Sequence, residues 1–286
     1  MTRLLSLLFP TSLLLAGTAL AFRPTWMPLS LMPLTATGLA LGVAMLLERV
    51  RPRVARDAEP GETRADVLWF VWTGLASRPL AAAAVAALAA WVHPTNGADG
   101  WTSWFVVDTV ATLLVLEFGD YWAHRLAHTQ PWWWKLHAVH HAPHRMTALN
   151  NARLHPLDVL LKELFIMLPV LLLAPKTEVL VAAATLRGVG VAFQHADVDL
   201  HHGWLNWVFS TNSNHRWHHS NAPQEAHANY GGFLMVFDHL FGTYLNKADA
   251  DEPAAMGLFD DDGYPVHQVV RSTAAPVCWR RCVGAP

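Results

Sequence analysis

The chain has 286 residues, of which 53% are hydrophobic and 15% are charged, and its formal net charge is −2 at pH 7. Typical soluble domains carry about 25% charged residues, so this composition argues against an ordinary soluble domain. The chain has no basic excess, so we expect no nucleic-acid partner.

Apolar segments dominate the first part of the chain. A bilayer-spanning helix needs about 20 apolar residues, and the candidates are residues 4–21, 27–47, 67–92 and the shorter 104–118. Two later runs, 160–173 and 179–193, flank Pro175 and Lys176 and are short for full spans. We expect them to enter the membrane and return as a hairpin at 160–193. The sequence therefore predicts an all-α, multi-span integral membrane protein with about four spans plus this hairpin.

The arginines predict the orientation of these segments. Residues 48–66, between the second and third segments, contain five arginines, whereas residues 93–103 contain no Lys or Arg. Short arginine-rich loops stay on the cytoplasmic side, so the fourth segment descends to the cytoplasm. The first segment resembles a signal peptide, with Arg3 before it and Ala19-Leu20-Ala21 at its end. We favour an uncleaved span, because the rest of the chain is itself predicted to be multi-span.

Histidines recur at helical spacing directly after the fourth segment. His124 and His128 are four residues apart, and the sequences HAVHH (137–141) and HRWHH (215–219) both place histidines at i, i+3 and i+4. On a helix such residues share one face, so each set can aim its imidazoles at one point. Imidazole is a common ligand of iron, zinc, copper and nickel. Eight such ligands exceed the needs of one ion, so the pattern predicts two adjacent ions.

The residue types narrow the metal and the function. No Cys or Met accompanies the histidines, which disfavours copper(I) and iron–sulfur clusters, and the HExxH motif of zinc proteases is absent. A nitrogen-rich dinuclear site at a membrane face suits iron and dioxygen, although zinc can occupy it in purified samples. Two alternatives stay open: a zinc-dependent membrane hydrolase with Glu163 or Glu225 as its base, and a non-enzymatic membrane metal-binding protein. A transporter should carry its metal ligands within spans, whereas these histidines lie at the ends of the apolar segments and between them.

The motifs resemble those of a known family. DYWAHRLAH (120–128), HAVHH and HRWHH, with RLHP (153–156), FQHADVDL (193–200), NYGG (229–232) and FDHLFGTY (237–244), look like the fatty acid hydroxylase / sterol desaturase superfamily. The resemblance covers about residues 105–246. It implies an integral membrane oxygenase that hydroxylates or desaturates a membrane lipid with two iron ions and dioxygen, and that takes electrons from a separate donor protein.

The resemblance also implies the site residues. Carried over position by position, the metal ligands are His124, His128, His137, His140, His141, His195, His215, His218 and His219. Some members have a second histidine four residues after the equivalent of His195, where this chain has Asp199. Asp197 or Asp199 is therefore a candidate oxygen ligand or hydrogen-bond partner. Asp120, Asp238 and His155 are candidate partners that orient the ligands.

The remaining features suggest how the chain is organised. Trp132, Trp133 and Trp134 fit the membrane–water interface, where amphipathic rings collect. Residues 1–246 are expected to form one membrane-embedded domain, and the acidic segment 247–286 a polar, partly flexible tail. The lipid substrate, the choice between hydroxylation and desaturation, the redox partner and the oligomeric state are not specified by the sequence.

Overall fold

The computed structural model describes residues 11–13, 15–17, 28–54, 59–92, 104–200, 202–247, 252–259 and 263–282. Within these ranges the regular elements are helices, and extended pairing is limited to isolated bridges such as that between Phe209 and Leu234. The expected all-α class is confirmed for this part of the chain. The first apolar segment, residues 4–21, lies largely outside the described residues.

The helices follow the apolar segments closely. In chain order they are η1 (Leu29–Leu31), α3 (Met32–Val50), α4 (Glu62–Trp72), the π-helical η2 (Thr73–Ser77), α5 (Arg78–Val92), α6 (Phe105–Thr129), α7 (Pro131–His141), η3 (Asn150–Ala152), α8 (Pro156–Leu173), α9 (Thr177–Gln194), α10 (Leu205–Val208), α11 (Asn212–His218), α12 (Pro223–Ala226), α13 (Val236–Phe241) and α14 (Val269–Cys282).

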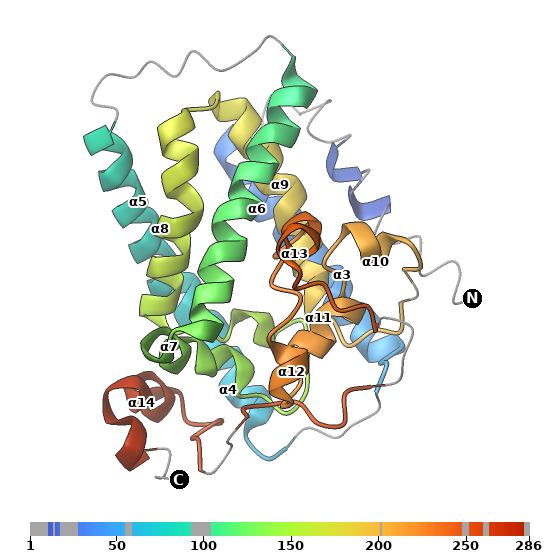
Figure 1. The fold of residues 1–286 in the computed structure, drawn as a ribbon, viewed down its shortest axis with the longest axis vertical. Coiled ribbons are helices and arrows are strands. Elements are labelled where there is room, and N and C mark those ends of the chain that lie inside the picture. Colours follow the sequence, from blue (N-terminus) through green and yellow to red (C-terminus); the bar gives the residue numbers. More distant parts are fainter. Residues whose placement is uncertain are drawn as a thin grey trace.

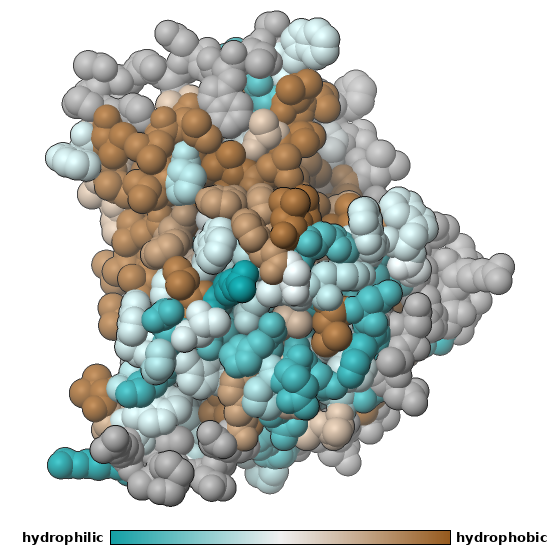
Figure 2. Space-filling model, in the orientation of Figure 1, coloured by the Kyte–Doolittle hydropathy of each residue, from teal (hydrophilic) through white to brown (hydrophobic). Residues whose placement is uncertain are grey.

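Two stretches of helix are long and apolar enough to cross a bilayer. They are Leu29–Val50 and Glu62–Val92, which correspond to the second and third predicted segments, and both leave most of their side chains unburied. Helix α6 corresponds to the fourth predicted segment. It contains the acidic residues Asp108 and Glu117, both buried, so it is less apolar than the other two stretches. Hydrophobic side chains cover the half of the molecule formed by the long helices, and polar side chains gather on the other half (Figure 2). The number of spans and their orientation stay predictions.

Helix α6 lies at the centre of the long helices (Figure 1). Helices α8 and α9 both pack against α6, while α5 packs on α8 and α3 packs on α9. Two helices form a hairpin at the expected place, because residues 174–176 join α8 to α9, and Ala174 ends α8 in the left-handed conformation at φ 48°. The free ends of α8 and α9 therefore lie at the same end of the molecule, beside α7 and α11. The entry of this hairpin into a membrane stays a prediction.

A buried ion network ties α6 to α9 and to the segment after α11. Arg187 on α9 donates from Nε to Glu117 Oε1 at 2.8 Å and pairs with Asp120 through Nη2. The other oxygen of Glu117 accepts from the backbone N–H groups of Phe233 and Leu234, at 2.8 Å each. Paired in this way, the buried charges offset their own desolvation cost and hold residues 233–234 against α6.

Close approach between α6 and α8 depends on Gly119. A Cβ at this position would lie 2.5 Å from the Phe165 carbonyl oxygen and 2.7 Å from Ile166 Cα, both of which are backbone atoms of α8. We therefore expect Gly119→Ala to lower the free energy of unfolding by about 1–3 kcal/mol, because overpacking forces the helices apart. Thermal unfolding of the full chain in mild detergent measures this effect. Gly42→Ala on α3 is the matched control, since no atom lies within 4 Å of its Cβ, and an equal loss in both variants would contradict the packing argument.

The described part of the C-terminal segment packs on the helices instead of extending into solvent. Leu258, Tyr264 and Val266 are buried in a cluster with Val139 of α7 and Trp69 of α4. The backbone carbonyl of Val266 accepts a 2.8 Å hydrogen bond from Arg153 Nη1. The expected polar tail therefore contributes buried apolar side chains beneath α7.

Candidate metal centre

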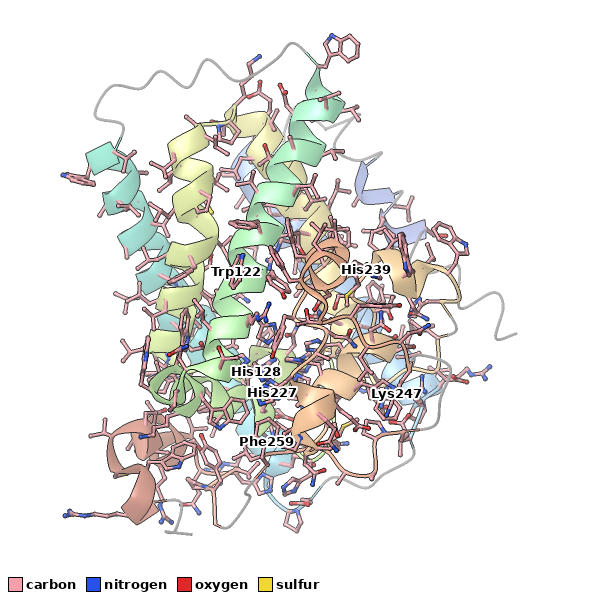
Figure 3. The ribbon with its side chains drawn as sticks, in the orientation of Figure 1. Trp122, His128, His227, His239, Lys247 and Phe259 are labelled. Atoms are coloured by element: carbon pink, nitrogen blue, oxygen red, sulfur yellow. The ribbon has the colours of Figure 1, made fainter. Side chains whose placement is uncertain are left out.

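Three helices carry the histidine motifs to one place. Helix α6 ends with His124 and His128 on its last two turns, and α7 begins immediately afterwards at Pro131, a residue suited to the first position of a helix. Thr211 caps the N-terminus of α11 by accepting from Asn214 N. Figure 3 shows His128 near the end of α6, with His227 and Phe259 below it.

All nine histidines expected as ligands fall into two buried clusters. The first cluster is formed by His124, His128, His137, His141 and His218, and the second by His140, His195, His215 and His219. Within each cluster one ring nitrogen of every member lies within 4.8 Å of the others. Each side chain is at most 6% exposed. The clusters therefore bring together residues that are up to 94 positions apart, as His124 and His218 are.

The histidines of one motif do not all join the same cluster, although each motif was expected to aim its imidazoles at one point. In HAVHH, His137 and His141 join the first cluster and His140 joins the second. In HRWHH the division is reversed: His215 and His219 join the second cluster and His218 joins the first. Residues i and i+4 differ by about 40° around a helix, whereas i+3 lies about 100° from i+4. The i+3 histidine of each motif therefore reaches across to the neighbouring cluster.

Short nitrogen–nitrogen distances link the rings within each cluster. His124 Nε2 lies 2.9 Å from His218 Nε2, and His128 Nε2 lies 3.1 Å from His141 Nε2. In the second cluster, His215 Nε2 is 3.0 Å from His195 Nε2 and 3.1 Å from His219 Nε2. Two imidazoles bound to one ion at about 2.1 Å, at roughly a right angle, have nitrogens about 3 Å apart. The spacing thus fits shared coordination of an ion.

Several ring nitrogens have no partner within the described protein. His137 Nε2 and the Nδ1 atoms of His128, His140, His141 and His215 are buried without a hydrogen bond. A buried polar atom without a partner costs about 1–3 kcal/mol. Their concentration in the two clusters is explained if metal ions satisfy the lone pairs of some of these rings. The donor set therefore fits two nitrogen-bound metal ions.

Outer hydrogen bonds orient the imidazoles. His124 Nδ1 lies 2.8 Å from the Tyr230 carbonyl oxygen, and His218 Nδ1 lies 2.7 Å from the Ala228 carbonyl oxygen. A carbonyl only accepts, so these Nδ1 atoms carry the proton and leave the Nε2 lone pairs facing the cluster. His195 Nδ1 lies 3.1 Å from Asn150 Oδ1 in the same way. These contacts preset the tautomer that a metal ion requires.

Burial keeps the histidines neutral. Desolvation lowers the pKa of every imidazole in both clusters, and it lowers that of His195 to about 3. The positive charge of Lys162 adds to the effect at members of both clusters. At neutral pH these rings are therefore in the form that donates a lone pair to a metal ion.

Asp158 is a further carboxylate beside the histidines, which the motifs did not predict. Its Oδ2 lies 2.9 Å from His137 Nδ1, and its Oδ1 accepts from Trp133 Nε1 at 2.8 Å, with Asp158 fully buried. Burial raises the pKa of this carboxyl, but His137, Lys162 and the hydrogen bonds outweigh burial, so the pKa is lowered overall. Trp133 was expected at the membrane interface and is instead 1% exposed. The signal in the sequence was an acidic residue two positions after RLHP, at the start of an apolar helix.

Two of the carboxylates proposed from the sequence are engaged away from the histidines. Asp120 pairs with Arg187, and Asp197 lies 3.5 Å from Arg216 Nη2. Neither Asp197 nor Asp199 belongs to either cluster. Glu225, one candidate base, binds Ser220 and Lys247 at 2.6 and 2.7 Å.

The other two proposed residues act at a distance from the histidines. Asp238 accepts from the backbone N–H groups of Tyr230 and Gly231 at 2.8 Å each. These bonds hold the Tyr230 carbonyl, which accepts from His124 Nδ1. His155 caps helix α8, since its Nδ1 accepts from Leu157 N at 3.1 Å. That cap stabilises the first turn of α8, where Asp158 lies.

Aromatic rings cover one side of the first cluster. Trp134 stacks on Phe259 with ring centroids 4.9 Å apart, and its ring lies 5.1 Å from that of His128. The ring centroid of His227 lies 5.3 Å from that of Phe259 and 5.7 Å from that of His128. Figure 3 labels these three residues. This layer shields the first cluster from water on that side.

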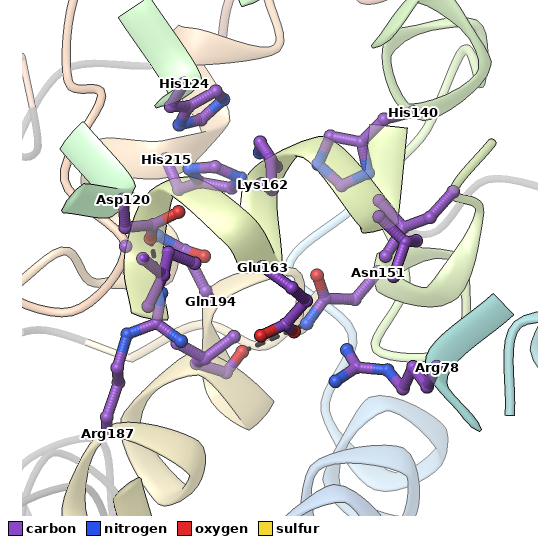
Figure 4. Close-up of a pocket in the computed structure, with 15 residues that line it drawn as sticks. Arg78, Asp120, His124, His140, Asn151, Lys162, Glu163, Arg187, Gln194 and His215 are labelled. Atoms are coloured by element: carbon purple, nitrogen blue, oxygen red, sulfur yellow. Dashed lines mark hydrogen bonds and ion pairs between the residues drawn. The ribbon is translucent and has the colours of Figure 1, made fainter. Parts of the chain in front are cut away.

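A pocket of about 120 Å³ opens beside both clusters. Its lining includes His124 from the first cluster and His140 and His215 from the second. Figure 4 shows these rings together with charged side chains from α5, α6, α8 and α9. The full lining is Arg78, Asp120, His124, His140, Asn151, Leu154, Val159, Lys162, Glu163, Ile166, Arg187, Val191, Gln194, His215 and Gly232. A small group placed here reaches both clusters at once.

Comparison with known proteins places this histidine-rich region in a family. The fatty acid hydroxylase family model matches residues 109–243. Ornithine lipid hydroxylase OlsE of Rhizobium tropici is 40% identical over 171 residues, which cover 59% of this chain and 51% of OlsE. Alkylglycerol monooxygenase of Xenopus tropicalis is 28% identical over 152 residues, covering 52% of this chain and 32% of that protein. Delta(7)-sterol-C5(6)-desaturase of Nicotiana tabacum is 29% identical over 156 residues, covering 53% and 54%.

The matched region spans between about a third and about half of the length of these relatives. No solved structure matches the chain significantly. All nine clustered histidines lie within residues 109–243. The relatives are lipid hydroxylases, monooxygenases and desaturases, which are oxidoreductases. The chain therefore contains a fatty acid hydroxylase domain, and this domain belongs to the fatty acid hydroxylase / sterol desaturase superfamily.

Proposed function

We propose that the chain is a dioxygen-dependent lipid oxidoreductase whose two histidine clusters hold two iron ions. The observation that supports this most directly is the pair of buried, neutral imidazole clusters that border one pocket. When bound, the ions supply activation of dioxygen and oxidation of an unactivated C–H bond. We propose all nine clustered histidines as the metal ligands.

The overall reaction needs a supply of electrons. Hydroxylation consumes the lipid, one dioxygen, two electrons and two protons, and it yields the alcohol and one water. Desaturation of the same lipid with the same electrons yields an alkene and two waters. A separate donor protein is proposed to deliver the electrons, because the sequence carries no haem, flavin or iron–sulfur motif.

The chain's own residues prepare the site. Asp158, Asn150 and the carbonyl groups of Tyr230 and Ala228 hold the imidazoles in place. The aromatic layer around Trp134 limits access of water, which protects reactive species from side reactions. Residues 1–246 are proposed as one membrane-embedded domain, with the centre at the cytoplasmic face.

Lipid analysis under controlled oxygen tests this function. We expect lipid extracts from cells expressing the chain in air to contain species heavier by one oxygen atom or lighter by two hydrogen atoms. Ornithine lipid is the first substrate to try, given the name of the relative OlsE. With ¹⁸O₂, a hydroxylated product should carry the label. Equal formation of these products under argon would contradict an oxygenase. Cleavage of an ester or amide bond of the lipid with uptake of water, equal in air and under argon, would favour a metal-dependent hydrolase, for which Glu163 in the pocket is the available base.

A further inference from the structure

Three charged side chains in the pocket make no hydrogen bond or ion pair with described protein groups. Arg187 and Asp120 bind each other, but no hydrogen bond or ion pair among the described residues engages the side chains of Arg78, Lys162 or Glu163, all of which line the pocket. The lining as a whole carries three cations, Arg78, Lys162 and Arg187, against two anions, Asp120 and Glu163, and Arg187 is the cation that the anions already engage. Charged groups that line a cavity without a partner are costly unless a ligand or water compensates them.

The position of Arg78 makes this arrangement unusual. It lies inside Glu62–Val92, one of the two stretches apolar enough to span a membrane, directly after the π-helical turn Thr73–Ser77. Charged residues within spans are rare and usually face a cavity or a substrate path. Figure 4 shows the guanidinium of Arg78 directed towards the pocket, on the side of Glu163 and Asn151. The turn before it belongs to a class that recurs at functional sites.

Lys162 lies on α8 opposite the histidines. Its ammonium group points towards His215 and His140 in Figure 4. Two divalent ions held by neutral imidazoles would add four positive charges with no carboxylate among the ligands. Like charges this close destabilise each other, so a cation at Lys162 is accommodated best when an anion lies between it and the ions.

We propose that Arg78 and Lys162 form a subsite that binds the carboxylate or phosphate group of a lipid head beside the two clusters. This inference rests on the proposed function and specifies its substrate class. The cavity of about 120 Å³ is comparable with a cavity of about 150 Å³ that accommodates benzene, so it suits a compact anionic group. Leu154, Val159 and Ile166 line the same pocket and contact the adjoining aliphatic part. The oxidised carbon then lies close to the charged head and not at the end of an acyl chain.

Binding of a matched probe pair tests the subsite without relying on turnover. The probes are N-dodecanoylglycine and its methyl ester, which share a tail and differ by one negative charge. Equilibrium dialysis against the metal-containing full chain in nonionic detergent should show the acid bound about tenfold more tightly, as charge-assisted hydrogen bonds imply. Lys162→Met and Arg78→Met should each remove most of this preference and change ester binding less than about twofold. Glu163→Gln should tighten binding of the acid, because it removes a competing negative charge.

Control variants separate a local effect from a change in total charge. Lys135→Met on α7 and Arg64→Met on α4 remove the same charges away from the pocket lining and should keep the preference. Equal binding of acid and ester, or a preference that survives in both Lys162→Met and Arg78→Met, overturns the subsite. Displacement of the probe by inorganic phosphate at the same concentration also overturns it, since the pocket would then be a site for small anions.

Metal content measured on the same samples distinguishes the two proposals. Full metal content without any preference for the acid refutes the subsite and leaves the oxidoreductase intact. A preference for the acid in protein that binds no metal refutes the oxidoreductase and retains the anion subsite.

Discussion

Replacing His218 by alanine should remove one metal ion per chain and leave the other, and replacing the adjacent His219 should remove the other ion. His218 Nε2 faces His124 in the first cluster, whereas His219 Nε2 faces His215 in the second. We expect each single variant to retain about one of two ions and to lose more than about 100-fold in lipid oxidation, because dinuclear chemistry needs both ions. Elemental analysis of protein purified after growth in iron-supplemented medium measures the content.

Two double variants test which histidines hold the same ion. His141→Ala with His218→Ala removes two members of the first cluster taken from different motifs, so about one ion should stay bound. His218→Ala with His219→Ala removes neighbours in one motif that belong to different clusters, so no ion should stay bound. The outcome thus follows membership in a cluster and not membership in a motif.

A histidine outside both clusters is the control. His239 is partnered with the Trp207 carbonyl at 2.8 Å, and His239→Ala should bind both ions. Retention of an ion in the His218/His219 double variant, together with loss of both ions in the His141/His218 variant, would show that each motif holds one ion and that the division into clusters is wrong.

The sequence predicted most of this arrangement because helical periodicity is local. The apolar segments mark α3, α5, α8 and α9 closely, and the hairpin brings His155 and His195 to the same end of the molecule. The spacing of HAVHH and HRWHH predicted helices that gather histidines, and α7 and α11 do so. It did not predict which ring joins which cluster, because that depends on how α7 and α11 approach α6.

Partners that come from distant segments were harder to predict. Asn150 reaches His195 across 45 positions, and Asp158 reaches His137 across 21 positions from the start of another helix. Asp197 and Asp199 are candidate ligands because they lie close to His195 in sequence, yet Asp197 forms an ion pair with Arg216. Residue type alone places Trp133 at an interface, and the position of Asp158 at the start of an apolar helix does not reveal that Asp158 accepts from Trp133 Nε1.

Asp158 controls the orientation of His137, and its removal should weaken metal binding to the first cluster selectively. The carboxylate accepts from His137 Nδ1, so Nε2, which is buried without a protein partner, faces the cluster. An anionic partner also strengthens the imidazole as a ligand, and loss of such partners lowers metal affinity by about 10–100-fold. We expect metal affinity of the first cluster to fall about tenfold in Asp158→Asn, which keeps an acceptor and loses the charge. In Asp158→Ala it should fall about 100-fold. Chelator competition, read as metal retained per chain, measures both.

The matched control is Trp133→Phe, which removes the other donor to Asp158 and leaves His137 in place. That variant should lose stability by about 1 kcal/mol, as a lost buried hydrogen bond implies, while metal affinity changes less than about threefold. The second cluster has no contact with Asp158, so one ion should resist chelation equally in all three variants. If Trp133→Phe weakens metal binding as much as Asp158→Ala, Asp158 acts through packing of α7 against α8. If both ions leave Asp158→Asn together, the two clusters behave as one cooperative site in which a single misplaced imidazole releases both ions.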